Sequence, residues 1–227
     1  AKEYLINERH LSEEAIKEFN IGLALNDNNL NKLLSSKGYS DKDIIEMSLA
    51  NKTDNGLLDM FRNRITFPIC NHEGKIIAYS ARIYQNEDTS KYINSKESII
   101  FKKGYTFYNY DKCRLEALKT KSVILVEGQM DAIRVYTSGF KNVIASMGTA
   151  ITSNHISLLK KLNAKVILMM DNDNAGEKST ILNGEELIKN NIEVSVVRLT
   201  GEKDPDSFIL KNGADAFRDA LKGEISF

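Results

Sequence analysis

Ser122-Val-Ile-Leu-Val126 runs directly into Glu127-Gly-Gln-Met-Asp131, and the pattern returns where Lys165-Val-Ile-Leu-Met-Met170 runs into Asp171-Asn-Asp-Asn-Ala-Gly176. Each stretch joins an apolar run without polar alternation to an acidic segment. Such runs are typical of strands that are buried on both faces, and a helical pattern follows each one. The two stretches therefore predict βαβ units, in an α/β fold with a mostly parallel sheet flanked by helices.

Acidic side chains stand where the two predicted strands end. In open α/β sheets ligands bind beyond the carboxyl ends of the strands, so Glu127, Asp171 and Asp173 are expected to meet there. Carboxylates that gather in one place repel one another unless a cation lies among them. Oxygen ligands of this kind suit Mg²⁺ or Mn²⁺. These three residues are therefore predicted metal ligands.

Three further aspartates extend the predicted metal site. Asp131 follows Glu127 in the first stretch, and Asp204 and Asp206 flank Pro205 in a turn that precedes a last helical region. The acidic residues thus form three clusters at successive strand ends: Glu127 with Asp131, Asp171 with Asp173, and Asp204 with Asp206. Three such clusters indicate a metal site more strongly than one Asp-x-Asp pair does. Each of these aspartates has a structural alternative, because Asp131 can stabilise a helix N-terminus and the other two can form the turn.

Composition sets the class of protein. The chain has 227 residues, a formal net charge of zero and no apolar run near the roughly 20 residues of a membrane helix. Its N-terminus lacks the apolar block of a signal peptide, so we expect a cytoplasmic protein without membrane contact. Cys70 and Cys113 show neither zinc-site nor disulfide-framework spacing, and we expect both to be buried thiols.

Basic residues gather in the middle of the chain. Between Arg62 and Lys119 there are eleven Lys or Arg and six Asp or Glu, and residues 57–110 read as antiparallel strands around a turn at 71–75. Arginine holds phosphate bidentately, and nearby aromatic rings can stack on bases. The alternative is an ordinary solvated strand face. The predicted nucleotide or nucleic-acid contacts are Arg62, Arg64, Arg82, Lys91, Asn94, Lys102 and Lys103.

Taken together, these segments resemble a known family. The three acidic clusters resemble the motifs of the Toprim fold, and Met147-Gly-Thr-Ala150 resembles a Gly-Thr-Ala loop of one Toprim family. That family is the catalytic core of DnaG-type bacterial primases, and the basic segments also resemble it. These segments are Phe61-Arg-Asn-Arg-Ile-Thr-Phe-Pro-Ile69, Ser80-Ala-Arg-Ile83, Lys91-Tyr-Ile-Asn-Ser95 and Ile100-Phe-Lys-Lys-Gly104. The sequence departs from the family at Gln129, where an aromatic is usual, and at Ala81, where Gly is usual.

The resemblance implies a division of the chain into three parts. We expect a basic subdomain of helices followed by antiparallel strands at residues 1–114, a Toprim subdomain at 115–202 and a C-terminal helical segment at 203–227. The family's zinc ribbon and helicase-binding domain have no counterpart in this sequence. We therefore expect an excised, monomeric polymerase core that holds no zinc and reaches the replicative helicase through a domain absent here.

The resemblance also implies an activity. Primases are DNA-directed RNA polymerases that join ribonucleoside triphosphates into short RNA primers on a single-stranded DNA template, by metal-dependent nucleotidyl transfer. Asp171 and Asp173 would hold Mg²⁺ or Mn²⁺, with Glu127 as a shared ligand or proton acceptor. Arg64 and Lys103 would contact the triphosphate or the template during catalysis.

Two other functions compete with primer synthesis. Another Toprim enzyme, a nuclease or a topoisomerase, would break phosphodiesters with the same metal chemistry. A topoisomerase needs a nucleophilic Tyr on a separate domain, and neither activity accounts for the arginines around the 71–75 turn. A binding module for single strands or nucleotides would use the basic residues without catalysis. Incorporation of labelled ribonucleotide on a primed template separates these functions.

Overall fold

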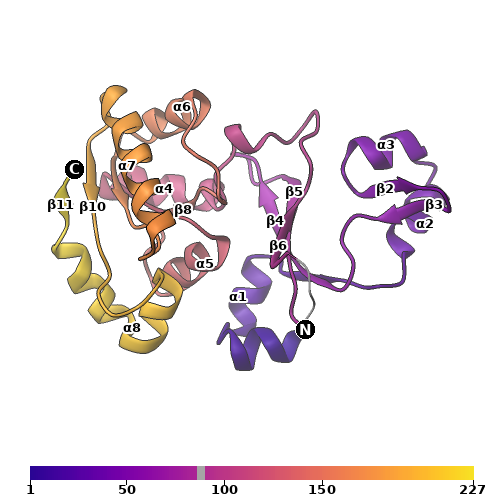
Figure 1. Cartoon of the computed structure of the whole chain (residues 1–227), viewed down its shortest axis with the longest axis horizontal. Coiled ribbons are helices and arrows are strands. Elements are labelled where there is room, and N and C mark those ends of the chain that lie inside the picture. Colours follow the sequence, from indigo (N-terminus) through magenta and orange to yellow (C-terminus); the bar gives the residue numbers. More distant parts are fainter. Residues whose placement is uncertain (86–89) are drawn as a thin grey trace. The chain divides into compact units, whose positions relative to one another are not determined.

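The computed structural model describes residues 1–85 and 90–227, which form two compact units (Figure 1). The first unit comprises Ala1–Ile69 and Lys75–Lys102, and the second comprises Cys70–Gly74 and Lys103–Phe227. Glu87 and Asp88, two of the acids counted in the basic region, lie outside the described residues. In the described ranges no helix is long and apolar enough to cross a membrane.

A five-stranded sheet forms the centre of the second unit, in the order β11-β10-β9-β7-β8. The strands are β7 (Ser122–Val126), β8 (Val143–Ala145), β9 (Lys165–Leu168), β10 (Val194–Val196) and β11 (Ile225–Ser226). Neighbouring strands from β10 to β8 run parallel, and β11 pairs antiparallel with β10. The predicted mostly parallel sheet, with the two apolar runs as adjacent strands, is confirmed.

Helices pack on both faces of this sheet (Figure 1). They are α4 (Tyr110–Thr120), α5 (Gln129–Thr137), α6 (Ser153–Leu162), α7 (Asn174–Lys189) and α8 (Pro205–Lys222), and a short 3₁₀ turn, η2 (Lys103–Tyr105), precedes them. Val123 and Leu125 of β7 join side chains of α4, α6 and α7 in one apolar cluster. On the other face α5 packs against β8 and α8, and Ile124 and Val126 of β7 are buried. Burial on both faces explains why the strand sequences lack polar alternation.

The strand order reverses at β7. The chain passes from β7 through α5 to its neighbour β8, and then through α6 to β9 on the opposite side of β7. Such a reversal opens a crevice at the carboxyl ends of the two strands, where open α/β sheets bind their ligands. Glu127 follows β7 directly and Asp171 lies just beyond β9, so the topology places both residues at this switch point.

A four-stranded sheet organises the first unit, in the order β1-β4-β5-β6. Its strands are β1 (Gly22–Ala24), β4 (Arg64–Cys70), β5 (Ile76–Arg82) and β6 (Tyr92–Asn94). β1 pairs antiparallel with β4, and β6 pairs antiparallel with β5. The predicted turn joins β4 to β5, with Asn71 accepting a hydrogen bond from the backbone of Glu73 at 3.0 Å and Gly74 at φ 80.

Short helices and a second hairpin complete the first unit. They are the π-helix η1 (Tyr4–Glu8), α1 (Glu13–Glu18), α2 (Asn29–Ser36), α3 (Asp41–Glu46) and the antiparallel pair β2 (Ala50–Thr53) and β3 (Gly56–Asp59). Two of the helices are capped by serine, because Ser12 accepts from the N–H of Ala15 at 3.1 Å and Ser40 forms a capping box with Asp43. Strand β1 was not predicted, since Gly-Leu-Ala lacks the β-branched residues typical of strands.

Candidate active site

Glu127 and Asp171 lie together at the carboxyl ends of β7 and β9. Oε1 of Glu127 accepts a hydrogen bond from the backbone N–H of Asp171 at 3.3 Å. Oδ1 of Asp171 is buried and has no hydrogen-bond partner in the part of the chain that the structure describes. Burial of a carboxylate oxygen without a hydrogen-bond donor costs free energy of folding, so such atoms are rare in folded proteins. It marks a position where a cation or a water molecule completes the site.

Burial and mutual repulsion raise the pKa of both carboxyl groups. For Glu127 burial is the largest cause; the hydrogen bond from Asp171 opposes it, and the charge of Asp173 adds to it. Burial, followed by the charges of Glu127 and Asp204, raises the pKa of Asp171 to about 6. Burial and repulsion therefore make ionisation of these two side chains less favourable than that of a free carboxyl group, and a divalent cation between them would favour ionisation.

Asp173 lies two residues beyond Asp171 and caps α7. Its Oδ1 accepts from the backbone N–H groups of Ala175 at 3.0 Å and Gly176 at 2.9 Å. These hydrogen bonds, with that from Gly176 as the largest cause, lower the pKa of Asp173. Its other oxygen, Oδ2, lies 3.6 Å from Nζ of Lys203. Asp173 therefore adds an exposed, ionised carboxylate to the same edge of the sheet.

Gly176, in the first turn of α7, lies against the backbone of Asp171. A Cβ atom at residue 176 would lie 2.0 Å from the carbonyl oxygen of Asp171, which is far inside any van der Waals contact. The close approach of helix to strand end therefore requires glycine at this position. This contact sets the offset between Asp171 at the end of the strand and Asp173 at the start of the helix.

The starts of α5 and α8 are joined by contacts among Asp131, Arg134 and Asp206. Oδ2 of Asp131 accepts from the N–H of Gly128 at 3.2 Å, and its Oδ1 accepts from the N–H of Asp206 at 3.1 Å. Nε of Arg134 lies 2.8 Å from Oδ1 of Asp206, and both side chains are buried. Asp204 caps α8 by accepting from the N–H of Ser207 at 2.8 Å. Each of these aspartates therefore has a structural role. Asp131 acts at a helix start, as its structural alternative predicted, whereas Asp204 caps α8 and Asp206 lies within that helix, so the predicted turn around Pro205 is replaced by the start of α8.

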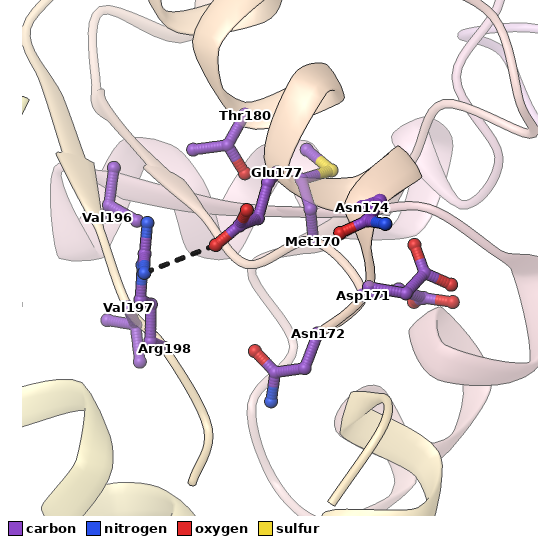
Figure 2. A pocket seen from close by; sticks show the side chains of 10 residues that line it. Met170, Asp171, Asn172, Asn174, Glu177, Thr180, Val196, Val197 and Arg198 are labelled. Atoms are coloured by element: carbon purple, nitrogen blue, oxygen red, sulfur yellow. Dashed lines mark ion pairs between the residues drawn. The ribbon is translucent and has the colours of Figure 1, made fainter.

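A pocket of about 210 Å³ opens beside Asp171 and Asp173, between the start of α7 and the end of β10. Figure 2 shows Glu177 of α7 reaching toward Arg198, and their nearest charged atoms lie 3.5 Å apart. Thr180 and Asn174 add polar groups to the lining. The pocket is small and polar, and it adjoins the carboxylates without containing Glu127.

The carboxylates fit a hydrated Mg²⁺ or Mn²⁺ better than a rigid cage of protein ligands. Among residues 1–85 and 90–227, no group of three His, Cys, Asp or Glu side chains is arranged to hold a metal ion. Mg²⁺ is usually bound by one or two carboxylates, several waters and substrate phosphates. The unpartnered oxygen of Asp171 and the adjacent carboxylates of Glu127 and Asp173 meet that requirement.

Arg64 and Arg82 of the first unit are held within the fold and are not spread over a solvated face. Both side chains are buried, and Nη1 of Arg64 donates to the carbonyl of Ser90 at 2.9 Å. The guanidinium of Arg82 lies 5.6 Å from the ring centroid of Tyr4 and 5.3 Å from that of Tyr92, whose hydroxyl accepts from its Nη1 at 2.9 Å. Nε of Arg82 is buried without a hydrogen-bond partner among the described residues.

The other predicted contacts differ in their exposure. Arg62, Lys91 and Lys102 are exposed, and Asn94 is half-buried on β6, where its Oδ1 has no hydrogen-bond partner among the described residues. Lys103 is half-buried and begins η2 in the second unit. Contacts of these residues with nucleotide or template stay predictions.

Comparison with protein families identifies the chain. The model described as "DNA primase catalytic core, N-terminal domain" matches residues 1–114. The chain belongs to the DNA primase catalytic-core family. A second model, described as "Toprim-like", matches residues 124–209 of this primase core. This range contains most of β7, the other three parallel strands and the six predicted acidic ligands from Glu127 to Asp206.

Known primases resemble the chain over nearly its full length. A DNA primase from Staphylococcus aureus is 38% identical over 222 residues, which are 96% of this chain and 36% of that protein. The RNA polymerase domain of Mycobacterium tuberculosis primase DnaG superposes with a TM-score of 0.91 at 26% identity, covering 99% of this chain and 76% of that one. A DnaG primase catalytic domain bound to single-stranded DNA gives 0.87 at 29% identity, covering 99% and 71%. This primase core therefore spans about a third of the S. aureus protein's length.

In the structure of the primase core, some predicted ligands lie together and others form contacts with different parts of the chain. Glu127 and Asp171 share a hydrogen bond at the predicted edge, and Asp173 follows two residues later. The carboxylates of Asp131 and Asp206 already contact other groups of the chain through a hydrogen bond and an ion pair. Their role as metal ligands stays a prediction. Arg134 was not among the predicted site residues, although its position three residues after Asp131 places it on the same helix face.

The burial of Asp131 gives the primase core a testable pH dependence. Burial, with the charges of Asp204 and Asp171 next, raises the pKa of Asp131 from 3.8 to about 8. Between those two values the unfolded chain loses this proton and the folded chain keeps it, so stability falls as the pH rises. Asp131→Asn removes this titration. We expect the melting temperature of the variant minus that of the unmodified chain to increase from pH 4 to pH 8, measured with EDTA present. A constant difference would contradict the expectation.

Proposed function

We propose that this chain synthesises short RNA primers on single-stranded DNA by metal-dependent nucleotidyl transfer. In this reaction the 3′-hydroxyl of one nucleotide attacks the α-phosphate of a ribonucleoside triphosphate, and pyrophosphate leaves. Membership of the primase catalytic-core family supports the proposal. So does the similarity to a primase domain whose structure was determined with single-stranded DNA. The bacterial primases among its relatives also support a cytoplasmic location.

The observation that carries the proposal is the buried, unpartnered oxygen of Asp171 beside Glu127. A structural carboxylate in a folded protein normally has its hydrogen bonds satisfied, as those of Asp131 are. Asp171 instead keeps an oxygen without a partner in the described chain and a raised pKa at a topological switch point. These properties are expected of a carboxylate that binds a metal ion.

Glu127, Asp171 and Asp173 would hold Mg²⁺ or Mn²⁺. A bound divalent cation lowers the pKa of a coordinated hydroxyl and offsets the negative charge that develops on the phosphate oxygens. Glu127 lies where it can share the metal or accept the proton of the attacking hydroxyl. Asp173, held by two backbone N–H groups, stays ionised without reorganisation.

Ribonucleotide incorporation tests the proposal directly. The chain would be mixed with a primed single-stranded template, labelled ribonucleoside triphosphate and Mg²⁺ or Mn²⁺, and products would be separated by length. We expect extension of the primer that depends on the divalent ion and on the template. Cleavage of the template without extension would support a nuclease, and binding without either reaction would support a binding module.

Arg82 is proposed to contact phosphate of the template. If it does, Arg82→Gln reduces the slope of log Kd against log salt for a single-stranded oligonucleotide by about 0.7, since one fewer counterion is released. Glutamine replaces the guanidinium with a neutral polar amide, and thermal denaturation checks that the fold is retained without the Nη1–Tyr92 hydrogen bond. Lys32→Ala, at an exposed position of α2, is the matched control and leaves the slope unchanged. An unchanged slope for Arg82→Gln would assign this arginine to packing between its tyrosines.

A further inference from the structure

Asn172 lies between two of the proposed metal ligands and attaches the loop between β10 and α8 to the acidic edge. Its Nδ2 donates to the carbonyl of Glu202 at 2.7 Å and also to the carbonyl of Leu199. Its backbone N–H donates to the carbonyl of Lys203 at 2.7 Å. These three hydrogen bonds fix the loop backbone beside Asp171, so the side chain of Lys203 begins next to the ligands.

Lys203 directs its ammonium group back to this edge. Nζ lies 3.6 Å from Oδ2 of Asp173, and the two side chains are 63% and 42% exposed. The charge of Lys203 also acts against the burial that raises the pKa of Glu127 and of Asp171. One lysine thus supplies positive charge to all three proposed ligands in the metal-free protein.

We propose that Lys203 is a built-in counter-ion of the metal site, which competes with the divalent cation for Asp173 and turns into solvent when the cation binds. The inference rests on the metal site of the proposed function. An ammonium and a divalent cation repel each other, and Oδ2 of Asp173 cannot serve both at close range. The exposed lysine can swing away at little cost, because its flexible stem ends in water. Lys203 therefore keeps the empty edge from carrying its full negative charge and weakens metal binding.

Direct titration with Mn²⁺ tests this competition without reference to activity. Free Mn²⁺ would be followed by electron paramagnetic resonance at low ionic strength, using the whole chain and its variants. We expect Lys203→Ala to bind Mn²⁺ about two- to fivefold more tightly, the range expected from removing one partly exposed ion pair. The difference shrinks at high salt, because added ions screen the lysine. Lys203→Arg retains the charge and binds Mn²⁺ like the unmodified chain.

Lys222→Ala is the matched control, since it removes an exposed lysine paired with Asp219 elsewhere in the second unit. It leaves the Mn²⁺ affinity unchanged. Equal or weaker binding by Lys203→Ala overturns the inference. A further variant, Asp171→Asn, separates the two proposals: if it binds Mn²⁺ as well as the unmodified chain does, the metal site itself fails and the counter-ion with it. If Mn²⁺ binding depends on Asp171 but not on Lys203, only the counter-ion inference fails.

Discussion

Replacing Asp171 with Asn is expected to abolish nucleotide joining and leave the fold intact. Asparagine has nearly the same shape, but it is a neutral and much weaker ligand for Mg²⁺ at the position of the unpartnered oxygen. In EDTA the variant should melt at the same temperature or slightly higher, because the repulsion between Asp171 and Glu127 is removed. We expect ribonucleotide incorporation below about a hundredth of the unmodified rate, a loss of about 2.7 kcal/mol in transition-state stabilisation.

Asp215→Asn provides the comparison for this variant, because Asp215 lies on α8 with its side chain 94% exposed. It makes the same chemical change in the same unit and should incorporate ribonucleotides at the unmodified rate. Retention of more than about a tenth of the activity by Asp171→Asn, a loss below roughly 1.4 kcal/mol, would remove Asp171 from the site. A large fall in melting temperature would instead show that the carboxylate is structural.

Arg134→Met is expected to destabilise the second unit strongly. Methionine fills much of the same volume but leaves the buried carboxylate of Asp206 without its ion partner. Breaking a buried pair from one side typically costs about 3 to 5 kcal/mol. For a chain of this size that corresponds to roughly 6 to 20 °C in melting temperature, which calorimetry would measure.

The same substitution at an exposed pair separates charge from burial. Arg218 pairs with Asp215 on the surface of α8, and Arg218→Met should cost less than about 1 kcal/mol. Adding Asp206→Asn to Arg134→Met should recover part of the lost stability, because the second change removes the buried charge that Arg134 offsets. Equal losses at both arginines, or no recovery in the double variant, would mean that the buried pair contributes no more than a surface one.

The parallel sheet could be predicted from sequence because its strands are continuous apolar runs that end in acidic residues. β7 and β9 show this pattern, and burial on both faces is its physical cause. The β2–β3 pair was not predicted as a hairpin, because Ala50–Thr53 and Gly56–Asp59 are short and lack polar–apolar alternation. Local sequence carries little information about such a pair.

The acidic site could be predicted only in part. Topology brings Glu127 and Asp171 to one edge, and that much follows from two strands with acidic ends. The pairing of Arg134 with Asp206 joins residues 72 positions apart, so no local pattern announces it. Lys203 was equally hidden, because its role depends on the hydrogen bonds of Asn172 to a distant loop. The acidic residues are alike in the sequence. The structure distinguishes Asp171, which keeps an oxygen without a hydrogen-bond partner among the described residues, from the acids whose oxygens accept hydrogen bonds.

The contact between Gly176 and the carbonyl of Asp171 limits how this region can vary. A single methyl group at residue 176 would push α7 away from the strand end, and the distance between a strand-borne and a helix-borne carboxylate would change with it. On the outer side of the same helix, Ile181 and Leu182 are exposed, and we expect polar replacements there to leave the fold unchanged. We therefore expect substitutions to be tolerated on the exposed face of α7 and not at residue 176, which lies against the strand end. A change in the spacing of the proposed metal ligands therefore requires the helix and the strand end to be redesigned together.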